Sequence, residues 1–155
     1  MLREEVERLY AQHGPGLVAF ACSILGDRAS AEDVLHQVFL KLLERSALAP
    51  DDTRSYLFRA VRNAALNVQR SRGRHVELDS QAAWFEAPAE STGEGIALEL
   101  ALKELPSEQR EIIMLRIWGG MTLEEAAAVL EIPANTASSR YRYGLAKLRQ
   151  RLGRA

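Results

Sequence analysis

The sequence predicts an all-α protein built from two small helical domains and a linker. Three observations lead to this prediction. Apolar residues recur at helical spacing along most of the 155 residues, no stretch alternates as a half-buried strand does, and residues 74–95 have no lasting period. That last segment is rich in acidic residues, glycine and serine, so we expect a flexible acidic linker there. The expected domains are residues 1–73 and 96–155.

Glycine and proline divide the first domain into four expected helices. The first covers residues 2–12 and breaks at the Gly-Pro-Gly of 14–16, and the second covers residues 17–26. Ser30 is expected to cap the third helix, because acidic residues follow it in the first turn, at the positive end of the helix dipole. The fourth helix covers residues 53–71. Four short helices predict one small bundle.

The third helix should bury one stripe against the rest of this bundle. Its apolar residues recur at helical spacing; they are Val34, Leu35, Val38, Phe39, Leu42 and Leu43. In the linker, Trp84-Phe85 is an apolar pair among polar residues, and we expect it to dock on a domain.

The second domain should end in a helix-turn-helix. Helices are expected at 96–105 and 107–118, the first ending before a proline and the second before Gly119-Gly120. Thr122 and Glu125 have the spacing of a capping box, which opens a short alanine-rich helix. A turn follows, and Pro133 suits the first turn of the last helix, because its missing N–H is not needed there.

The formal net charge of −1 conceals strong charge blocks. Residues 54–74 carry six arginines and no acid, residues 75–99 carry six acids and no lysine or arginine, and residues 136–155 carry six cations and no acid. An anionic spacer therefore separates two cationic segments. Block patterning of this kind points to an anionic partner such as a nucleic acid.

Several classes of function are excluded. His13, His36 and His75 are too far apart for metal-ligand spacing, and no nucleophile elbow or phosphate loop is present, so we expect no catalytic residue, metal or cofactor. The single cysteine, Cys22, fits a reducing cytoplasm and should be a buried small hydrophobe. The longest apolar run, residues 17–25, is too short to span a bilayer, and no signal peptide is evident, so we expect a cytoplasmic protein without membrane insertion.

The last helix has one apolar and one polar side. Its apolar side carries Ala137, Tyr141, Leu145, Leu148 and Leu152. Its polar residues are the candidate contacts for duplex DNA: Asn135, Thr136, Ser138, Ser139, Arg140, Arg142, Tyr143 and Lys147. Short polar groups first and cations further along suit a helix that enters the major groove. The alternative is a solvated amphipathic helix, but such a face usually mixes both signs of charge.

The first cationic segment gives a second set of candidates on the helix at 53–71. They are Arg59, Arg62, Asn63, Asn67 and Arg70, with aromatic residues beside them. Arginine contacts phosphates, whereas asparagine and aromatic side chains can hydrogen-bond and stack an unpaired base. A basic solvated helix is again the alternative, and the presence of a second candidate DNA-reading unit makes it the weaker one.

With both segments identified, the chain resembles an extracytoplasmic-function (ECF) sigma factor of the bacterial sigma-70 superfamily. Three motifs in order carry the resemblance: AEDVLHQVFLKLLER, SYLFRAVRNAALNVQR, and LKELPSEQREIIMLRIWGGMTLEEAAAVLEIPANTASSRYRYGLAKLR. It implies a sigma-2-like bundle, which binds core polymerase and reads the −10 element. It also implies a sigma-4-like helix-turn-helix, which reads the −35 element about 20–25 base pairs upstream.

The resemblance also implies partners and residue roles. The partners are the β′ clamp helices and β flap of core RNA polymerase, promoter DNA and an anti-sigma factor, with the linker in a cationic polymerase channel. Asn63 matches the residue that captures a flipped −10 base, and Thr136, Ser139 and Arg140 match the −35 helix. The residues expected to bind polymerase are Asp33, His36, Gln37 and Phe39.

The chain departs from the family pattern at several positions. His36 and Gln37 replace the usual Gln and Glu, Tyr56 replaces a Trp, and Glu131 occupies a turn position that is often glycine. Ala137 and Ser138 replace the common Val and Lys, so the promoter preference cannot be copied from relatives. The chain ends soon after its last helix, so we expect regulation by a separate partner protein or by control of its transcription. Two other functions remain open: an autonomous helix-turn-helix regulator and a helical protein-interaction adaptor.

Overall fold

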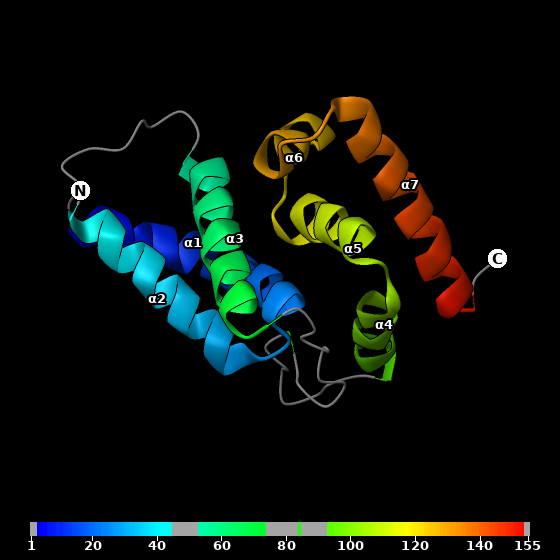
Figure 1. Ribbon diagram of the computed structural model, residues 1–155, viewed down its shortest axis with the longest axis horizontal. Helices are drawn as coiled ribbons and strands as arrows, with labels where there is room; N and C mark the ends of the chain where they lie inside the picture. The colour runs from blue at the N-terminus through cyan, green and yellow to red at the C-terminus, as the bar shows by residue number, and fades with distance from the viewer. Residues whose placement is uncertain (1–2, 45–52, 74–83, 85–92, 154–155) are drawn as a thin grey trace.

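The computed structural model describes residues 3–44, 53–73, 84 and 93–153, and these residues form helices and turns without a strand. The helices are α1 (Arg3–Leu25), α2 (Arg28–Glu44), α3 (Thr53–Ser71), α4 (Gly93–Glu104), α5 (Ser107–Ile113), the π-helix η2 (Met114–Trp118), α6 (Leu123–Leu130) and α7 (Ala134–Arg151). Figure 1 shows α1, α2 and α3 on one side of the molecule and α4 to α7 on the other. The all-α prediction is confirmed.

The first half of the molecule, formed by α1, α2 and α3, contains one helix fewer than expected. The Gly-Pro-Gly at 14–16 does not break the chain, and α1 continues through Pro15 to Leu25. A proline inside a helix costs about 3 kcal/mol through the lost hydrogen bond and its ring clash. Residues 17–25 are all buried, and α1 packs on both α2 and α3. This burial outweighs the local preference, because most helical stability in proteins comes from tertiary packing.

Two expectations about α2 were wrong. The helix begins at Arg28, and Asp27 rather than Ser30 caps it: the Ser30 N–H donates to Asp27 Oδ1 at 2.8 Å. Ser30 is then free to accept a bond from Arg72 through its hydroxyl. Leu43 is 42% exposed and lies outside the buried stripe, whereas the other five residues of that stripe are buried as expected.

The core of the first half is formed by large side chains from all three helices. Leu17, Phe20, Leu35, Leu57 and Phe58 are buried, and the rings of Phe20 and Phe58 lie 5.6 Å apart. Burying side chains of this size contributes about 1.5–3 kcal/mol each. The core therefore fixes α3, which carries the candidate DNA contacts of the first cationic segment, against α1 and α2.

Cys22 is part of this core, as expected. It has no exposed surface, and burial raises the pKa of its thiol to about 12. Because the thiolate is the reactive form, we expect no reaction of the folded chain with a disulfide reagent at pH 8, and stoichiometric reaction of one thiol in denaturant. Absorbance of the released thiolate measures both. Rapid labelling of the folded chain would contradict this placement.

The second half is a helix-turn-helix supported by α4, α5 and η2. The last helices begin and end close to the expected residues, but α4 starts at Gly93, three residues before the expected start. The helix expected at 107–118 changes from α to π form after Ile113 and ends at Trp118, with Gly119 as its C-cap. Glycine is required there, because a Cβ would lie 2.5 Å from the carbonyl oxygen of Leu115.

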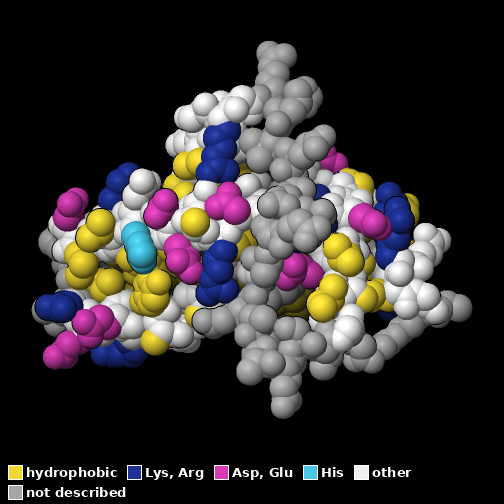
Figure 2. All heavy atoms as spheres, turned by 90° about the horizontal axis from the view of Figure 1, so that it is seen from below, with side chains coloured by type: hydrophobic (Ala, Val, Ile, Leu, Met, Phe, Trp, Pro, Cys, Tyr) yellow, Lys and Arg dark blue, Asp and Glu magenta, His cyan; other side chains and the backbone are white. Residues whose placement is uncertain are grey.

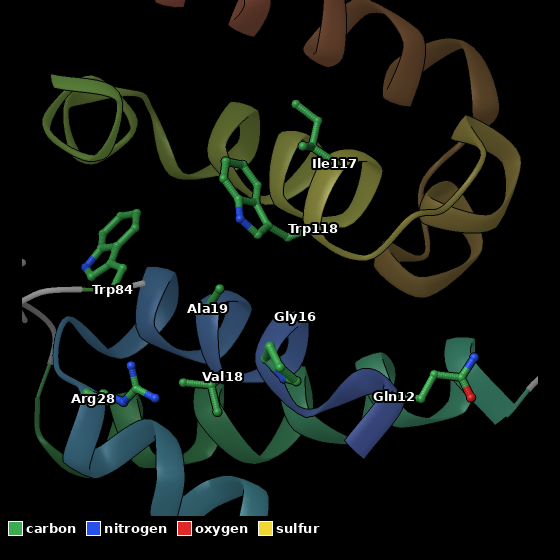
Figure 3. Close-up of a pocket in the computed structure, with 9 residues that line it drawn as sticks. Gln12, Gly16, Val18, Ala19, Arg28, Trp84, Ile117 and Trp118 are labelled. Carbon is green, nitrogen blue, oxygen red and sulfur yellow. The ribbon is translucent and has the colours of Figure 1, made fainter. Parts of the chain in front are cut away.

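The two halves are in contact, which the sequence did not indicate. Contacts join α1 to α5 and η2, and α3 to α6. A cavity of about 450 Å³ lies between α1 and η2, and Figure 3 shows Trp84 and Trp118 at this boundary. Trp84 is fully buried, so the expected docking of this residue is confirmed; Phe85 and most of the expected linker lie outside the described residues.

Candidate nucleic-acid interface

The turn before α7 is built by local signals in the sequence. The Thr122 hydroxyl accepts from the Glu125 N–H at 3.1 Å, and the Thr122 N–H donates to Glu125 Oε1 at 2.9 Å, which confirms the capping box. Glu131 ends α6 with φ 57° and ψ 46°, in the left-handed region. Pro133 is the residue before α7, one position earlier than expected. These features set the direction in which α7 leaves the turn.

Replacing Glu131 by glycine should stabilise the chain. A left-handed conformation costs a residue with a Cβ about 1 kcal/mol or more relative to glycine, so Glu131→Gly should raise the melting temperature by roughly 2–4 °C. Thermal unfolding followed by circular dichroism measures this. The control is Ala146→Gly at an exposed position inside α7, where glycine should lower the melting temperature. A decrease for both variants would contradict the strain at Glu131.

The position of α7 depends on a close crossing with α5. A Cβ at Gly144 would lie 2.6 Å from Ile113 Cδ1 and 3.3 Å from Gln109 Cβ. The sequence interpretation did not assign this residue, although a glycine inside a helical pattern can mark such a close approach. The expected apolar side of α7 is confirmed, since Ala137 and Leu148 are buried and the other three residues pack on the core.

The opposite side of α7 carries the candidate contacts for duplex DNA. Asn135, Arg142, Tyr143 and Lys147 are exposed, and Thr136, Ser138, Ser139 and Arg140 are half-buried. Tyr143 is 59% exposed, and the guanidinium of Arg142 lies 5.4 Å from the centre of its ring. Because no acidic residue occurs in α7, this surface is polar and cationic. Such a surface can contact base edges and phosphates.

A small hollow between α2 and α3 brings other candidates together. It has a volume of about 260 Å³, and its polar lining residues are Gln37, Lys41, Tyr56, Asn63 and Asn67. Both asparagines are exposed, one helical turn apart. An amide can donate to and accept from the edge of a base, and a tyrosine can stack on it. Gln37 was predicted to bind polymerase, but it lies beside Asn63 and Asn67, which were predicted to contact −10 DNA. Lys41 was not predicted to be a site residue.

The arginines of α3 are divided between solvent and the second half of the molecule. Arg70 is exposed. Arg62 Nε lies 3.1 Å from Glu111 Oε2, and Arg59 donates to the carbonyl oxygen of Ala128 at 3.1 Å. Two of the three candidate arginines are thus bound to α5 and α6 in this arrangement, and their partners are far away in the sequence.

The candidate polymerase-binding residues on α2 have unequal exposure. Asp33, His36 and Gln37 are exposed, but Phe39 is only 5% exposed and packs edge-on against Tyr10 with ring centres 5.0 Å apart. Phe39 therefore supports this surface from below. Leu40 is 59% exposed on the same side of α2 and was missed. Figure 2 shows this face with exposed hydrophobic side chains beside a histidine and acidic side chains.

The part of the chain that the structure describes was also searched for a metal site and for a membrane-spanning helix. No three metal-binding side chains gather among residues 3–44, 53–73, 84 and 93–153. Within the same residues, no helix is both long enough and apolar enough to cross a membrane. The polar and cationic sides of α3 and α7 remain the candidate contact surfaces among these residues.

Comparison with known proteins matches both halves. The family model "Sigma-70 region 2" matches residues 9–75, and "Sigma-70, region 4" matches residues 101–150. ECF RNA polymerase sigma factor EcfG of Rhodopseudomonas palustris is 30% identical over 141 residues, which is 86% of this chain and 77% of EcfG. ECF RNA polymerase sigma factor SigL of Mycobacterium tuberculosis is 29% identical over 91% of this chain and 85% of SigL.

Two solved structures match nearly the whole chain. The sigma factor RpoE from Bartonella quintana, in complex with the anti-sigma factor NepR, has a TM-score of 0.76 and 25% identity, and covers 97% of this chain and 98% of that chain. CnrH, in complex with the cytosolic domain of CnrY, has a TM-score of 0.69 and 26% identity, and covers 98% of this chain and 90% of that chain. The arrangement of the two halves is thus similar to that in both proteins.

Proposed function

Because this chain belongs to the ECF RNA polymerase sigma factors of the sigma-70 family, we infer that it binds core RNA polymerase and directs promoter-specific initiation of transcription. The observation that carries this function is the match of regions 2 and 4, in that order, on one chain. A sigma factor acts through binding free energy, so we propose no catalytic residue and no cofactor. Its place of action is the cytoplasm, where bacterial polymerase works.

We propose residues 1–73 as the unit that reads the −10 element. An unstacked base would enter the hollow between α2 and α3, where Asn63 and Asn67 can hydrogen-bond to its edge. Unstacking costs a few kcal/mol per base, and amide contacts to the edge offset part of this cost. Exposed Arg70 supplies a phosphate contact, which holds the strand without reading its sequence.

We propose residues 96–155 as the unit that reads the −35 element, with residues 74–95 as the acidic linker. The N-terminal part of α7 would lie in the major groove, with Asn135, Ser139 and Arg140 near base edges. Lys147, about two turns beyond Arg140, would contact phosphates. A good bidentate contact to a base contributes about 1–3 kcal/mol of discrimination.

Polymerase would dock on the exposed side of α2. Asp33 and His36 lie there beside the apolar surface of Leu40, so the partner surface should combine polar groups with an apolar contact. Phe39 contributes by holding this surface in place. We also propose a separate anti-sigma factor, since one similar structure contains RpoE bound to the anti-sigma factor NepR and the other contains CnrH bound to the cytosolic domain of CnrY.

Reconstituted transcription tests this function. Core polymerase with this chain should initiate at specific promoters identified from a genomic fragment library, and core polymerase alone should not. An autonomous regulator would instead bind a palindromic operator tightly without polymerase, and an adaptor would do neither. Failure of the chain to bind core polymerase in a pull-down, with tight operator binding in its place, would favour the autonomous regulator.

A further inference from the structure

The hollow between α2 and α3 is small and has an apolar part. Its apolar lining residues are Val38 of α2 and Ala60 and Ala64 of α3. Val38 is buried, and the two alanines are half-buried, one helical turn apart. Because alanine carries only a methyl group, space remains between two helices that pack side by side (Figure 1). The volume of about 260 Å³ is below the range of about 300–1,000 Å³ usual for drug-sized ligands, so the hollow suits one flat ring.

The polar groups around the hollow are not engaged elsewhere in the described part of the chain. There, Lys41 of α2 forms no ion pair, and the amides of Gln37, Asn63 and Asn67 form no hydrogen bond. All four residues are exposed. Their donors and acceptors are therefore available to a ligand, unlike those of the α3 arginines that contact α5 and α6.

The lining has one cation and no acid. The acidic residues of α2 are Glu32, Asp33 and Glu44, and the sequence of α3 contains none. None of these three lines the hollow, and Glu32 is paired with Arg28. A ligand in the hollow therefore meets the three donors of the Lys41 ammonium and several amides, but no carboxylate.

This combination of groups distinguishes two classes of base. Guanine and thymine present a keto oxygen, which accepts, at the position where adenine and cytosine present an amino group, which donates. A lysine ammonium only donates, so it can bond to a keto oxygen and not to an amino group. A carboxylate has the opposite preference, and an amide serves either class. Lys41 is thus the only group of the polar lining with a preference of this kind, apart from the tyrosine ring, which can stack on any base.

We propose that the hollow selects a keto base, guanine or thymine, from the unstacked −10 strand, and that Lys41 is the specificity-determining residue. Lys41 donates to the keto oxygen, and the amides of Gln37, Asn63 and Asn67 bond to the rest of the base edge. The inference rests on the proposed function for the origin of the base. The selection itself can be measured on the free chain without polymerase.

Fluorescence anisotropy with labelled oligonucleotides tests the selection on the full chain. Oligo(dT) and oligo(dC) of equal length carry the same charge, and their bases differ in the keto or amino group and in the methyl group of thymine. Oligo(dU) keeps the keto group without the methyl group. Wild type should bind oligo(dT) and oligo(dU) about five- to tenfold more tightly than oligo(dC), as expected for one good polar contact to a base.

Two variants test the residues, each with a matched control on α1. Lys41→Gln removes the cation and should bring the three affinities within about twofold of one another. Gln37→Glu adds a carboxylate that accepts from cytosine and pairs with Lys41 one turn away, so oligo(dT) should lose its advantage. Arg8→Gln and Gln12→Glu make the same charge changes at exposed positions. These controls should change all three affinities by one factor and keep the ratio.

Transcription by holoenzyme then distinguishes guanine from thymine. A promoter recognised by wild-type holoenzyme is randomised over its −10 element, and the templates that yield transcripts are sequenced. One of the two keto bases should be enriched about tenfold at one position. Holoenzyme with Lys41→Gln should lose this enrichment at that position and keep the preferences at the others.

Three results would overturn the proposal. One is equal binding of oligo(dT) and oligo(dC) by wild type. Another is an unchanged ratio in Lys41→Gln with weaker binding to every oligonucleotide, since Lys41 would then contact phosphates. The third is enrichment of adenine or cytosine at the position that Lys41→Gln alters. Absence of promoter-specific initiation by wild-type holoenzyme would overturn the proposed function and leave the oligonucleotide measurements unaffected.

Discussion

Holoenzyme that carries Asn63→Ala should initiate transcription about 10- to 100-fold less efficiently than wild type, because one bidentate base contact contributes about 1–3 kcal/mol. Asn63 is exposed on α3 and lines the hollow with Asn67 and Tyr56. Its amide has both a donor and an acceptor to match a base edge, and alanine has neither. Initiation rates on a promoter found by the library experiment measure the loss.

The matched comparison for Asn63→Ala is Arg70→Ala, on the exposed part of the same helix. Removing a phosphate contact should weaken binding to all sequences. It should also reduce the slope of log affinity against log salt concentration by about one. Removing a base contact should instead reduce the preference for the −10 sequence at one position. If Asn63→Ala lowers transcription equally on promoters with every base at that position, Asn63 does not read a base.

The helix-turn-helix could be predicted from the sequence because its signals are local. The Thr122–Glu125 capping box, the turn at Glu131 and the proline before α7 all act within a few residues. The exposed polar side of α7 follows from the same helical period that places Leu148 in the core. Prediction succeeded where the determinants lie close together in the chain.

Prediction failed where tertiary packing decides the outcome. The Gly-Pro-Gly at 14–16 predicts a break, but burial of residues 17–25 keeps α1 continuous. Gly16 lies at a close contact with Trp118, and only the packed structure indicates why glycine suits this position. We expected the Gly-Pro-Gly motif to break the helix. Instead, the helix continues through it, and Gly16 allows the close contact with Trp118.

The candidate site was also only partly visible in the sequence. A run of arginines without acids suggests DNA contacts, and Asn63, Asn67 and Arg70 are indeed exposed. The sequence cannot show that Arg59 and Arg62 have partners 69 and 49 residues away. Charge blocks predict what a segment can bind, but not which of its charges are already bound within the molecule.

The largest effect on stability is expected at Arg110, which binds four carbonyl oxygens. Its guanidinium donates to the carbonyls of Leu102 at 3.0 Å, Lys103 at 3.2 Å, Leu105 at 2.7 Å and Ser23 at 3.3 Å. Burial lowers the pKa of Arg110 from its usual range, but arginine stays charged at neutral pH. It thus supplies hydrogen bonds to carbonyl oxygens at and just after the C-terminal end of α4, which have no partner within the helix. Its bond to Ser23 also joins α5 to α1.

Arg110→Met keeps the aliphatic stem and removes all of these donors. A buried acceptor left without a partner costs about 1–3 kcal/mol, and water can reach some of these carbonyls, so we expect a total loss of about 3 kcal/mol. Thermal unfolding should shift down by roughly 10 °C for a chain of this size. Arg110→Lys should recover only part of the loss, since a lysine ammonium cannot reproduce the planar fork of donors.

Arg116→Met is the control, because Arg116 is exposed and the structure gives its side chain a hydrogen bond to one carbonyl, that of Met121 at 3.0 Å. Its loss should be about 1 kcal/mol, the usual net contribution of one hydrogen bond. Equal melting temperatures for the two methionine variants would mean that water replaces the Arg110 contacts at little cost. A much lower value for Arg110→Met would establish that one half-buried cation completes the C-terminal end of α4 and links α4 and α5 to α1.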